Sequence, residues 1–177
     1  VTVGDAEAAR TLRVKEEDAQ IVVSGTNFRY VFDKRTGIFS EMVYENRQLL
    51  ERPMEYNIWR APTDNDRVVK HEWIRAQYDR TSTRAYESIV NVDEVCVKIE
   101  ATLSMSAIYI QRILNIKAAF TIYADGTVDA ALDVKKDMEF PFLPRFGLRL
   151  FLPKTMNQVT YYGLGPAESY IDKKWAS

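Results

Sequence analysis

The residues best suited to chemistry lie in the stretch "NIWRAPTDNDR" at positions 57–67, where a strand-like run breaks at a proline. Asp64 and Asp66 stand two positions apart, with Asn65 between them. In an extended segment both carboxylates would project from one face and could share a cation or a sugar hydroxyl. Alternatively, the aspartates accept hydrogen bonds from the start of the following helix or from their own loop backbone. The sequence leaves both interpretations open.

These aspartates match two dedicated chemistries poorly. An EF-hand calcium loop would need further ligands, a glycine and a terminal glutamate that do not follow at the required positions. A glycosidase acid–nucleophile pair holds a sugar between carboxyl groups about 5–9 Å apart, and its members normally come from different elements. We therefore predict neither a catalytic residue nor a metal site in this chain.

Two other motifs give little support for a metal site or a dinucleotide-binding site. His71 is the only histidine, and Arg75 stands where a metalloprotease helix would need its second one, so we expect an exposed histidine on a polar helix. The segment "GLGPAE" at 163–168 fails as a dinucleotide fingerprint, because Glu168 replaces the third glycine and Pro166 lacks an N–H. It predicts a sharp turn presenting Glu168 and Tyr170, a carboxylate and an aromatic ring that suit a sugar.

The overall composition excludes several classes of protein. Of the 177 residues, 46% are hydrophobic and 28% charged, which allows a packed core. The charges of the 24 basic and 25 acidic residues nearly cancel, which argues against a nucleic-acid binder.

Cys96 is the only cysteine, so neither an internal disulfide nor a cysteine zinc site is expected. No apolar run approaches 18 residues, so we expect no membrane span. The chain starts without Met or a signal-peptide pattern, which indicates a processed or excised piece and leaves its compartment open.

Most of the chain around these residues is predicted to form strands, because hydrophobic residues recur with a period of two. Gly37 suits a turn with positive φ, and Asp125-Gly126 favours a type I′ hairpin turn. The predicted strands or groups of strands cover residues 19–50 (a β-meander), 94–105, 112–134, 145–153 and 158–165.

One helix is expected directly after the aspartates. Residues 68–80 place Val69, Trp73 and Ala76 on one amphipathic stripe. Residues 1–18 are charged and read as a linker or N-terminal extension, with the domain itself covering 19–177. Short antiparallel strands with Gly, Pro and Asp turns favour an all-β fold, an antiparallel sandwich.

Two long segments carry a family resemblance. They are "YVFDKRTGIFSEMVYENRQLLERPMEYNIWRAPTDND" (30–66) and "LPRFGLRLFLPKTMNQVTYYGLGPAESYIDKKWAS" (143–177). Together they resemble the small-chain domain of the β-galactosidases of glycoside hydrolase family 2. The second combines an arginine-bearing strand, a tyrosine, Gly-x-Gly-Pro and Tyr-x-Asp in the order that this domain shows.

The resemblance implies a super-sandwich similar to galactose mutarotases, at the C-terminal end of a five-domain, homo-oligomeric enzyme. Such enzymes hydrolyse terminal β-D-galactosides with retention, and their catalytic glutamates lie on a (β/α)8 barrel that this chain lacks. The loop after the Trp-Arg-Ala-Pro motif borders that active site, which implies a rim role for Asp64, Asn65, Asp66 and Arg67. Cofactors, Mg²⁺ and Na⁺, are expected only in other domains, and the implied location is the cytoplasm or periplasm of a bacterium.

The sequence also departs from the family pattern. The family domain continues for roughly a hundred residues after the matched part, with a sugar-stacking tryptophan that this chain does not contain. We therefore expect a truncated sandwich whose open edge favours self-association, and no hydrolysis by the chain alone. The alternatives to a non-catalytic β-galactosidase module are a stand-alone carbohydrate-binding module and a mutarotase-like epimerase; the second would need a general acid and base over the sugar.

Overall fold

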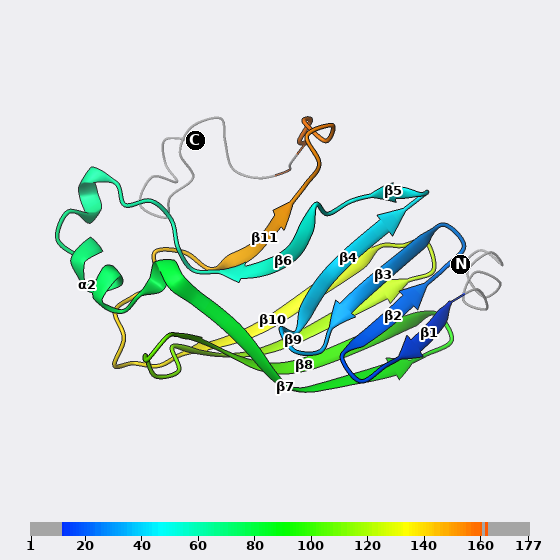
Figure 1. The fold of residues 1–177 in the computed structure, drawn as a ribbon, viewed down its shortest axis with the longest axis horizontal. Coiled ribbons are helices and arrows are strands. Elements are labelled where there is room, and N and C mark those ends of the chain that lie inside the picture. The colour runs from blue at the N-terminus through cyan, green and yellow to red at the C-terminus, as the bar shows by residue number, and fades with distance from the viewer. Residues whose placement is uncertain (1–11, 161, 163–177) are drawn as a thin grey trace.

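A computed structural model describes residues 12–160 and 162 of the chain. The first sheet is an antiparallel meander of five strands in chain order, formed by alternating apolar residues with turns between them (Figure 1). Gly37, between its third and fourth strands, has the positive φ (+72°) that the sequence predicts. The strands are β1 (Arg13–Glu16), β2 (Gln20–Ser24), β3 (Phe28–Asp33), β4 (Ile38–Tyr44) and β5 (Arg47–Gln48).

The second sheet contains four antiparallel strands in the order β10-β9-β8-β7. Along β8 and β9 the buried residues alternate with more exposed ones, so one face of each strand turns to the core. The strands are β7 (Thr81–Val92), β8 (Cys96–Ala107), β9 (Leu114–Tyr123) and β10 (Val128–Lys136).

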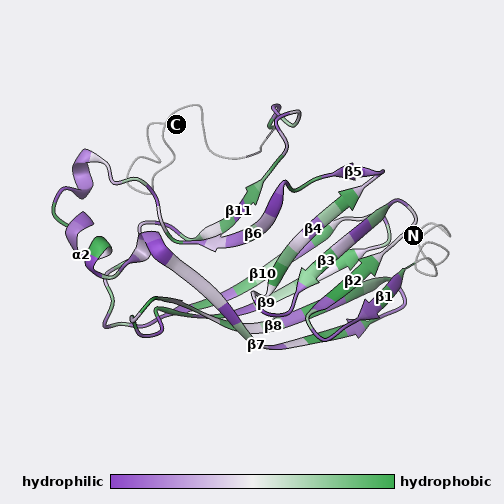
Figure 2. Cartoon of the chain, viewed as in Figure 1, coloured by the Kyte–Doolittle hydropathy of each residue, from purple (hydrophilic) through white to green (hydrophobic). Residues whose placement is uncertain are grey.

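A third, two-stranded ribbon pairs β6 (Arg52–Asn57) with β11 (Gly147–Phe151) and lies beside β4 (Figure 1). Between β6 and β7 the chain forms its helical segment: η1 (Asp64–Asp66), α2 (Lys70–Arg75) and η2 (Tyr78–Arg80). Figure 2 shows that this segment is mainly hydrophilic, whereas hydrophobic stretches run along the sheets. No helix among the described residues is long and apolar enough to cross a membrane.

The core lies between the first two sheets and is centred on three aromatic rings. Phe32 and Phe39 from the first sheet meet Phe120 from β9, with ring centroids 5.2–5.8 Å apart and edge-to-face geometry. All three side chains are almost completely buried. The hydroxyl of Tyr30 adds a cross-layer hydrogen bond of 2.8 Å to the carbonyl of Gly126. The predicted all-β antiparallel sandwich is confirmed.

The structure also confirms the predicted helix but corrects several local predictions. Trp73 and Ala76 are buried on the inner side of the helical segment, as the amphipathic stripe predicts. The turn at Asp125-Gly126 is not type I′, since only Gly126 has a positive φ; the two consecutive positive φ angles occur at Glu45 and Asn46 instead. The Gly126 N–H donates to the Tyr123 carbonyl, which makes a three-residue loop.

Two ends of the chain also differ from the sequence prediction. Residues 13–16, within the expected extension 1–18, form the edge strand β1 and pair with β2. The strand predicted at 158–165 is absent at positions 158–160 and 162, and the rest of that range lies outside the described residues. Strand β7 was not predicted, because as a solvent-facing edge strand it carries many polar residues and lacks a clear apolar alternation.

Replacing Gly37 with alanine should destabilise the sandwich by about 1–2 kcal/mol, because an L-residue at this φ is strained. The new Cβ would also lie 3.0 Å from a methyl carbon of Leu103 and 3.4 Å from the Cβ of Ala85. Gly147→Ala is the matched control, since nothing lies within 4 Å of its added Cβ. Urea unfolding of both variants measures the difference, and equal stabilities would contradict the strained turn.

Candidate functional site

The candidate site is the segment that leaves β6 and enters the helical region. Asn57, the last residue of β6, closes a local turn with its side chain: its amide donates to the Trp59 carbonyl (2.9 Å) and its oxygen accepts from the Trp59 N–H (3.2 Å). This turn directs residues 60–67 away from the sheet and over the end of the sandwich (Figure 1). An asparagine side chain that bonds its own backbone two residues on is a common way to start such a loop.

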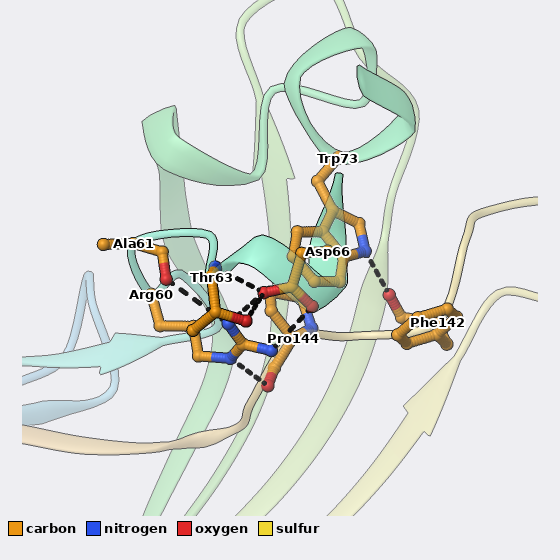
Figure 3. A network of polar contacts seen from close by, with 7 residues as sticks. All are labelled: Arg60, Ala61, Thr63, Asp66, Trp73, Phe142 and Pro144. Carbon is orange, nitrogen blue, oxygen red and sulfur yellow. Dashed lines mark hydrogen bonds and ion pairs between the residues drawn. The ribbon is translucent and has the colours of Figure 1, made fainter. Parts of the chain in front are cut away.

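The loop is organised around the buried carboxylate of Asp66 (Figure 3). Arg60 donates two hydrogen bonds to it, one to each oxygen, in a bidentate ion pair. Thr63 adds a backbone N–H at 2.7 Å and its hydroxyl at 2.9 Å. The Arg60 Nε also donates to the Pro144 carbonyl at 3.3 Å, which ties the loop to the segment before β11. Asp66 is therefore engaged entirely by the protein itself.

These contacts set the electrostatics of the site. The Arg60 hydrogen bonds, followed by the Thr63 backbone N–H, hold the pKa of Asp66 well below its ordinary value, and burial opposes them only in part. Asp66 is therefore ionised at neutral pH and already paired. A carboxylate in this state is neither a proton donor nor a free nucleophile, so its role is to fix the loop.

A second group of contacts anchors the helical segment behind the loop (Figure 3). The Trp73 indole is fully buried, donates to the Phe142 carbonyl at 2.9 Å and packs edge-to-face on the Phe142 ring. The Arg60 guanidinium lies 5.4 Å from the centre of the Trp73 ring. The Tyr78 hydroxyl donates to the Pro141 carbonyl at 2.7 Å, and burial raises the pKa of Tyr78 to about 12. The helical segment and residues 141–144 thus support the loop together.

The predicted rim residues divide into one buried and three exposed positions. Asp64, Asn65 and Arg67 are exposed, whereas Asp66 points inward. Because residues 64–66 form a turn of 3₁₀ helix, the extended geometry that would put Asp64 and Asp66 on one face does not occur. For Asp66 the local alternative holds, since it bonds the Thr63 backbone N–H at the start of that turn. The exposed carboxylate, amide and guanidinium can exchange hydrogen bonds with a polar ligand.

The other predicted residues are His71, Glu168 and Tyr170. His71 lies on α2 and is exposed, as predicted. Glu168 and Tyr170 lie outside the described residues. Within residues 12–160, no group of three or more His, Cys, Asp or Glu side chains is placed to hold a metal ion.

Sequence reasoning missed Arg60, whose side chain donates hydrogen bonds to Asp66 and to the Ala61 and Pro144 carbonyls. The available signal was an arginine between Trp59 and two aspartates, which predicts an ion pair without saying which aspartate accepts it. The choice of Asp66 depends on the 3₁₀ turn, which brings Asp66 back over Thr63. The spacing Thr63-x-x-Asp66 is a capping-box pattern, which is the local sequence signal for that turn.

Comparison with known proteins extends these observations. A family described as "Beta galactosidase small chain" matches residues 24–177. The chain is 39% identical over 163 residues to a β-galactosidase from Actinobacillus pleuropneumoniae, 35% over 161 residues to one from Staphylococcus xylosus, and 31% over 170 residues to one from Priestia megaterium. These alignments cover 92%, 90% and 92% of this chain but only 16% of each relative, so the chain spans about a sixth of their length. By this match and these identities, the chain belongs to the β-galactosidase small chain family.

Proposed function

We propose that this chain is a non-catalytic part of a β-galactosidase and that residues 64–67 shape the rim of the active site. The observation that carries the proposal is the division within one short loop. Asp66 is fixed by Arg60 and Thr63, while Asp64, Asn65 and Arg67 remain exposed. A loop held from inside and polar outside is suited to present hydrogen-bonding groups at fixed positions next to a substrate.

The proposal assigns bond cleavage to other parts of a longer polypeptide. The relatives named β-galactosidase are about six times longer than the matched region. We infer a catalytic (β/α)8 barrel in the same polypeptide as the immediate partner, a galactoside as the substrate and retaining hydrolysis as the reaction, with Mg²⁺ and Na⁺ held by other domains. Homo-oligomer formation belongs to the same proposal.

The chemistry of the exposed residues suits a sugar ring. An aspartate accepts hydrogen bonds from hydroxyl groups, an asparagine both donates and accepts, and an arginine donates. These groups orient a ring without reacting with it. We therefore expect their effect on catalysis to come from positioning and water exclusion, since the only buried carboxylate of the loop is already ion-paired.

Asp64→Asn combined with Asn65→Ala in the full-length β-galactosidase should lower kcat/KM for a chromogenic galactoside about tenfold. Both side chains are exposed, so the melting temperature should change by no more than about 2 °C. Glu94→Gln is the matched control, because Glu94 is also exposed but follows the opposite end of the long strand β7. Steady-state kinetics with thermal melting of each variant makes the measurement.

An unchanged kcat/KM in the double variant would contradict the rim role. The isolated 177-residue chain supplies a second check, because the proposal expects it to leave the chromogenic galactoside uncleaved. Turnover by pure chain would overturn the non-catalytic assignment. Interconversion of galactose anomers by pure chain would instead favour the mutarotase-like alternative.

A further inference from the structure

The outer face of the four-stranded sheet carries a polar row that the loop site does not use. Strand register places Glu87 opposite Thr102, Thr102 opposite Lys117 and Lys117 opposite Asp133. All four residues are exposed, since their neighbours along each strand supply the inward-facing positions. The row therefore offers two carboxylates, a hydroxyl and an ammonium side by side across the sheet.

A hollow of about 460 Å³ lies next to this row. Glu100, Ala119 and Ala131 form the adjacent row, also in cross-strand register, and the two alanines leave the middle of the face low. Ile89 adds apolar surface to the lining. We call this the alanine hollow. It combines a shallow apolar floor with polar groups at its border, which is the composition of small-molecule sites.

A second hollow of about 460 Å³ shares Glu87 with the first. Its lining includes Tyr86, Arg35, Arg84 and Asp18, and we call it the Tyr86 hollow. Ser88 also lines it, and the Ser88 hydroxyl oxygen is the one buried side-chain polar atom without a hydrogen-bond partner in the described part of the chain. The two hollows thus meet at a single carboxylate.

The Tyr86 ring is exposed yet held in place. Its side chain is 57% exposed, and it sits at the β-bulge that interrupts pairing between β7 and β8. Its hydroxyl and that of Ser104 are hydrogen-bonded at 2.8 Å, and the guanidinium groups of Arg84 and Arg112 lie 5.9 and 5.5 Å from the ring centre. A bulge re-aims a side chain, and here it presents a fixed aromatic ring at the surface.

The charged groups that line the alanine hollow are not used by the fold. Among the described residues, no ion pair or hydrogen bond involves the side chains of Glu87, Lys117 or Asp133. Charges of both signs alternate with a hydroxyl, so the row favours neither a polyanion nor a polycation. It matches a neutral ligand with many hydroxyl groups, each able to donate to a carboxylate and to accept from an ammonium.

We propose that the two hollows form a binding site for a short neutral oligosaccharide, with one ring on Tyr86 and another over Ala119 and Ala131. Four residues along a strand separate Tyr86's neighbour Ser104 from Glu100, a distance of about 13 Å, which requires a ligand of about three sugar rings. Glu87, Lys117 and Asp133 bind its hydroxyls between the two positions. The proposed function enters only in the choice of a β-galactoside as the first probe.

The test is a titration of the 177-residue chain with two trisaccharides, galactosyl-lactose and cellotriose, followed by isothermal calorimetry and by amide chemical shifts. We expect saturable binding, with shift changes centred on Tyr86, Ala119 and Ala131. Ala131→Arg fills the hollow and should raise Kd at least about tenfold, whereas Ala130→Arg adds the same side chain to the other face of β10 and should leave Kd unchanged. Both alanines are exposed, but Ala130 lies opposite the buried Phe120, so thermal melting of each variant checks that the fold is kept.

A second pair of variants tests the stacking position independently of β10. Tyr86→Ala should raise Kd about tenfold and Tyr86→Phe, which keeps the ring, no more than about threefold. Binding of cellotriose as well as galactosyl-lactose supports the oligosaccharide site without any link to β-galactosidase. The absence of saturable binding, or equal loss in Ala131→Arg and Ala130→Arg, overturns the site. That outcome leaves the proposed function standing, because its test measures catalysis at Asp64 and Asn65.

Discussion

Trp73→Ala lowers the free energy of unfolding by about 3–5 kcal/mol, the largest loss that we expect from a single substitution in this segment. The Trp73 side chain is fully buried, so its removal leaves a cavity that the surrounding sandwich can fill only in part. The Phe142 carbonyl, which accepts the indole N–H at 2.9 Å, also loses its partner. Urea denaturation followed by far-UV circular dichroism measures the loss.

Two comparisons make this result specific. Trp73→Phe keeps a ring at the position and should cost clearly less than the alanine variant, with a remaining loss from the missing indole N–H. Ile74→Ala alters the next residue of the same helix, where the side chain is 52% exposed, and should cost under about 1 kcal/mol. If Trp73→Ala and Ile74→Ala cost the same, α2 does not anchor the loop as the structure shows.

Asp66→Asn is expected to lower the melting temperature by about 5 °C or more, because the amide cannot replace the bidentate carboxylate that Arg60 requires. One end of the amide would also place donors against the donors of Arg60 and Thr63. Asp64→Asn is the matched control two positions earlier. Its side chain is exposed, so the melting temperature should stay within about 2 °C of the unaltered protein.

The effect of Asp66→Asn on the melting temperature should also depend on pH. The pKa of Asp66 is lowered in the folded state, first by the Arg60 hydrogen bonds, from an ordinary value of 3.8. A depressed carboxylate pKa contributes stability that is fully present above the unfolded pKa and is lost as the pH falls through the folded one. The difference in melting temperature between the unaltered protein and Asp66→Asn should therefore be constant near neutral pH and narrow below about pH 3.8.

A double-mutant cycle that combines Asp66→Asn with Arg60→Gln tests whether Arg60 is the partner of Asp66. The losses from Asp66→Asn and Arg60→Gln should not add, since either substitution removes the same ion pair. Additive losses, or a difference that stays constant down to pH 2, would contradict the proposed basis of the loop. The result also bears on the rim role, because the exposed Asp64 and Asn65 depend on Asp66 for their position.

Most strands could be predicted from the sequence because their signals are local. β3, β8, β9 and β10 carry an alternation of apolar and polar residues that indicates a half-buried strand, and β2 and β4 carry short apolar runs next to turn residues. The helix after the aspartates could be predicted from the spacing of Val69, Trp73 and Ala76. Strand β7 could not, because its polar composition reflects its place at the edge of a sheet, which only pairing with β8 defines.

The hairpin turns also could not be predicted fully from the local sequence. Asp125-Gly126 is a strong type I′ signal by composition, yet the chain uses Glu45 and Asn46 for consecutive positive φ angles. Packing explains part of this difference, since the Gly126 carbonyl accepts a hydrogen bond from Tyr30 in the opposite sheet. A contact between residues 96 positions apart is invisible to a pattern read over a few residues.

By itself, the sequence determined the all-β class, the order of most elements, the presence of a polar loop at 57–67 and a family resemblance in two segments. These properties depend on residue types and on spacings of a few positions, and both are present in the sequence before the chain folds. Tertiary structure alone decided that Arg60, while paired with Asp66, also reaches the Pro144 carbonyl 84 positions away, and that Tyr86, Lys117 and Ala131 share one face. Both outcomes require segments distant in sequence to meet at hydrogen-bond or van der Waals distance, and that depends on how the sheets pair and pack.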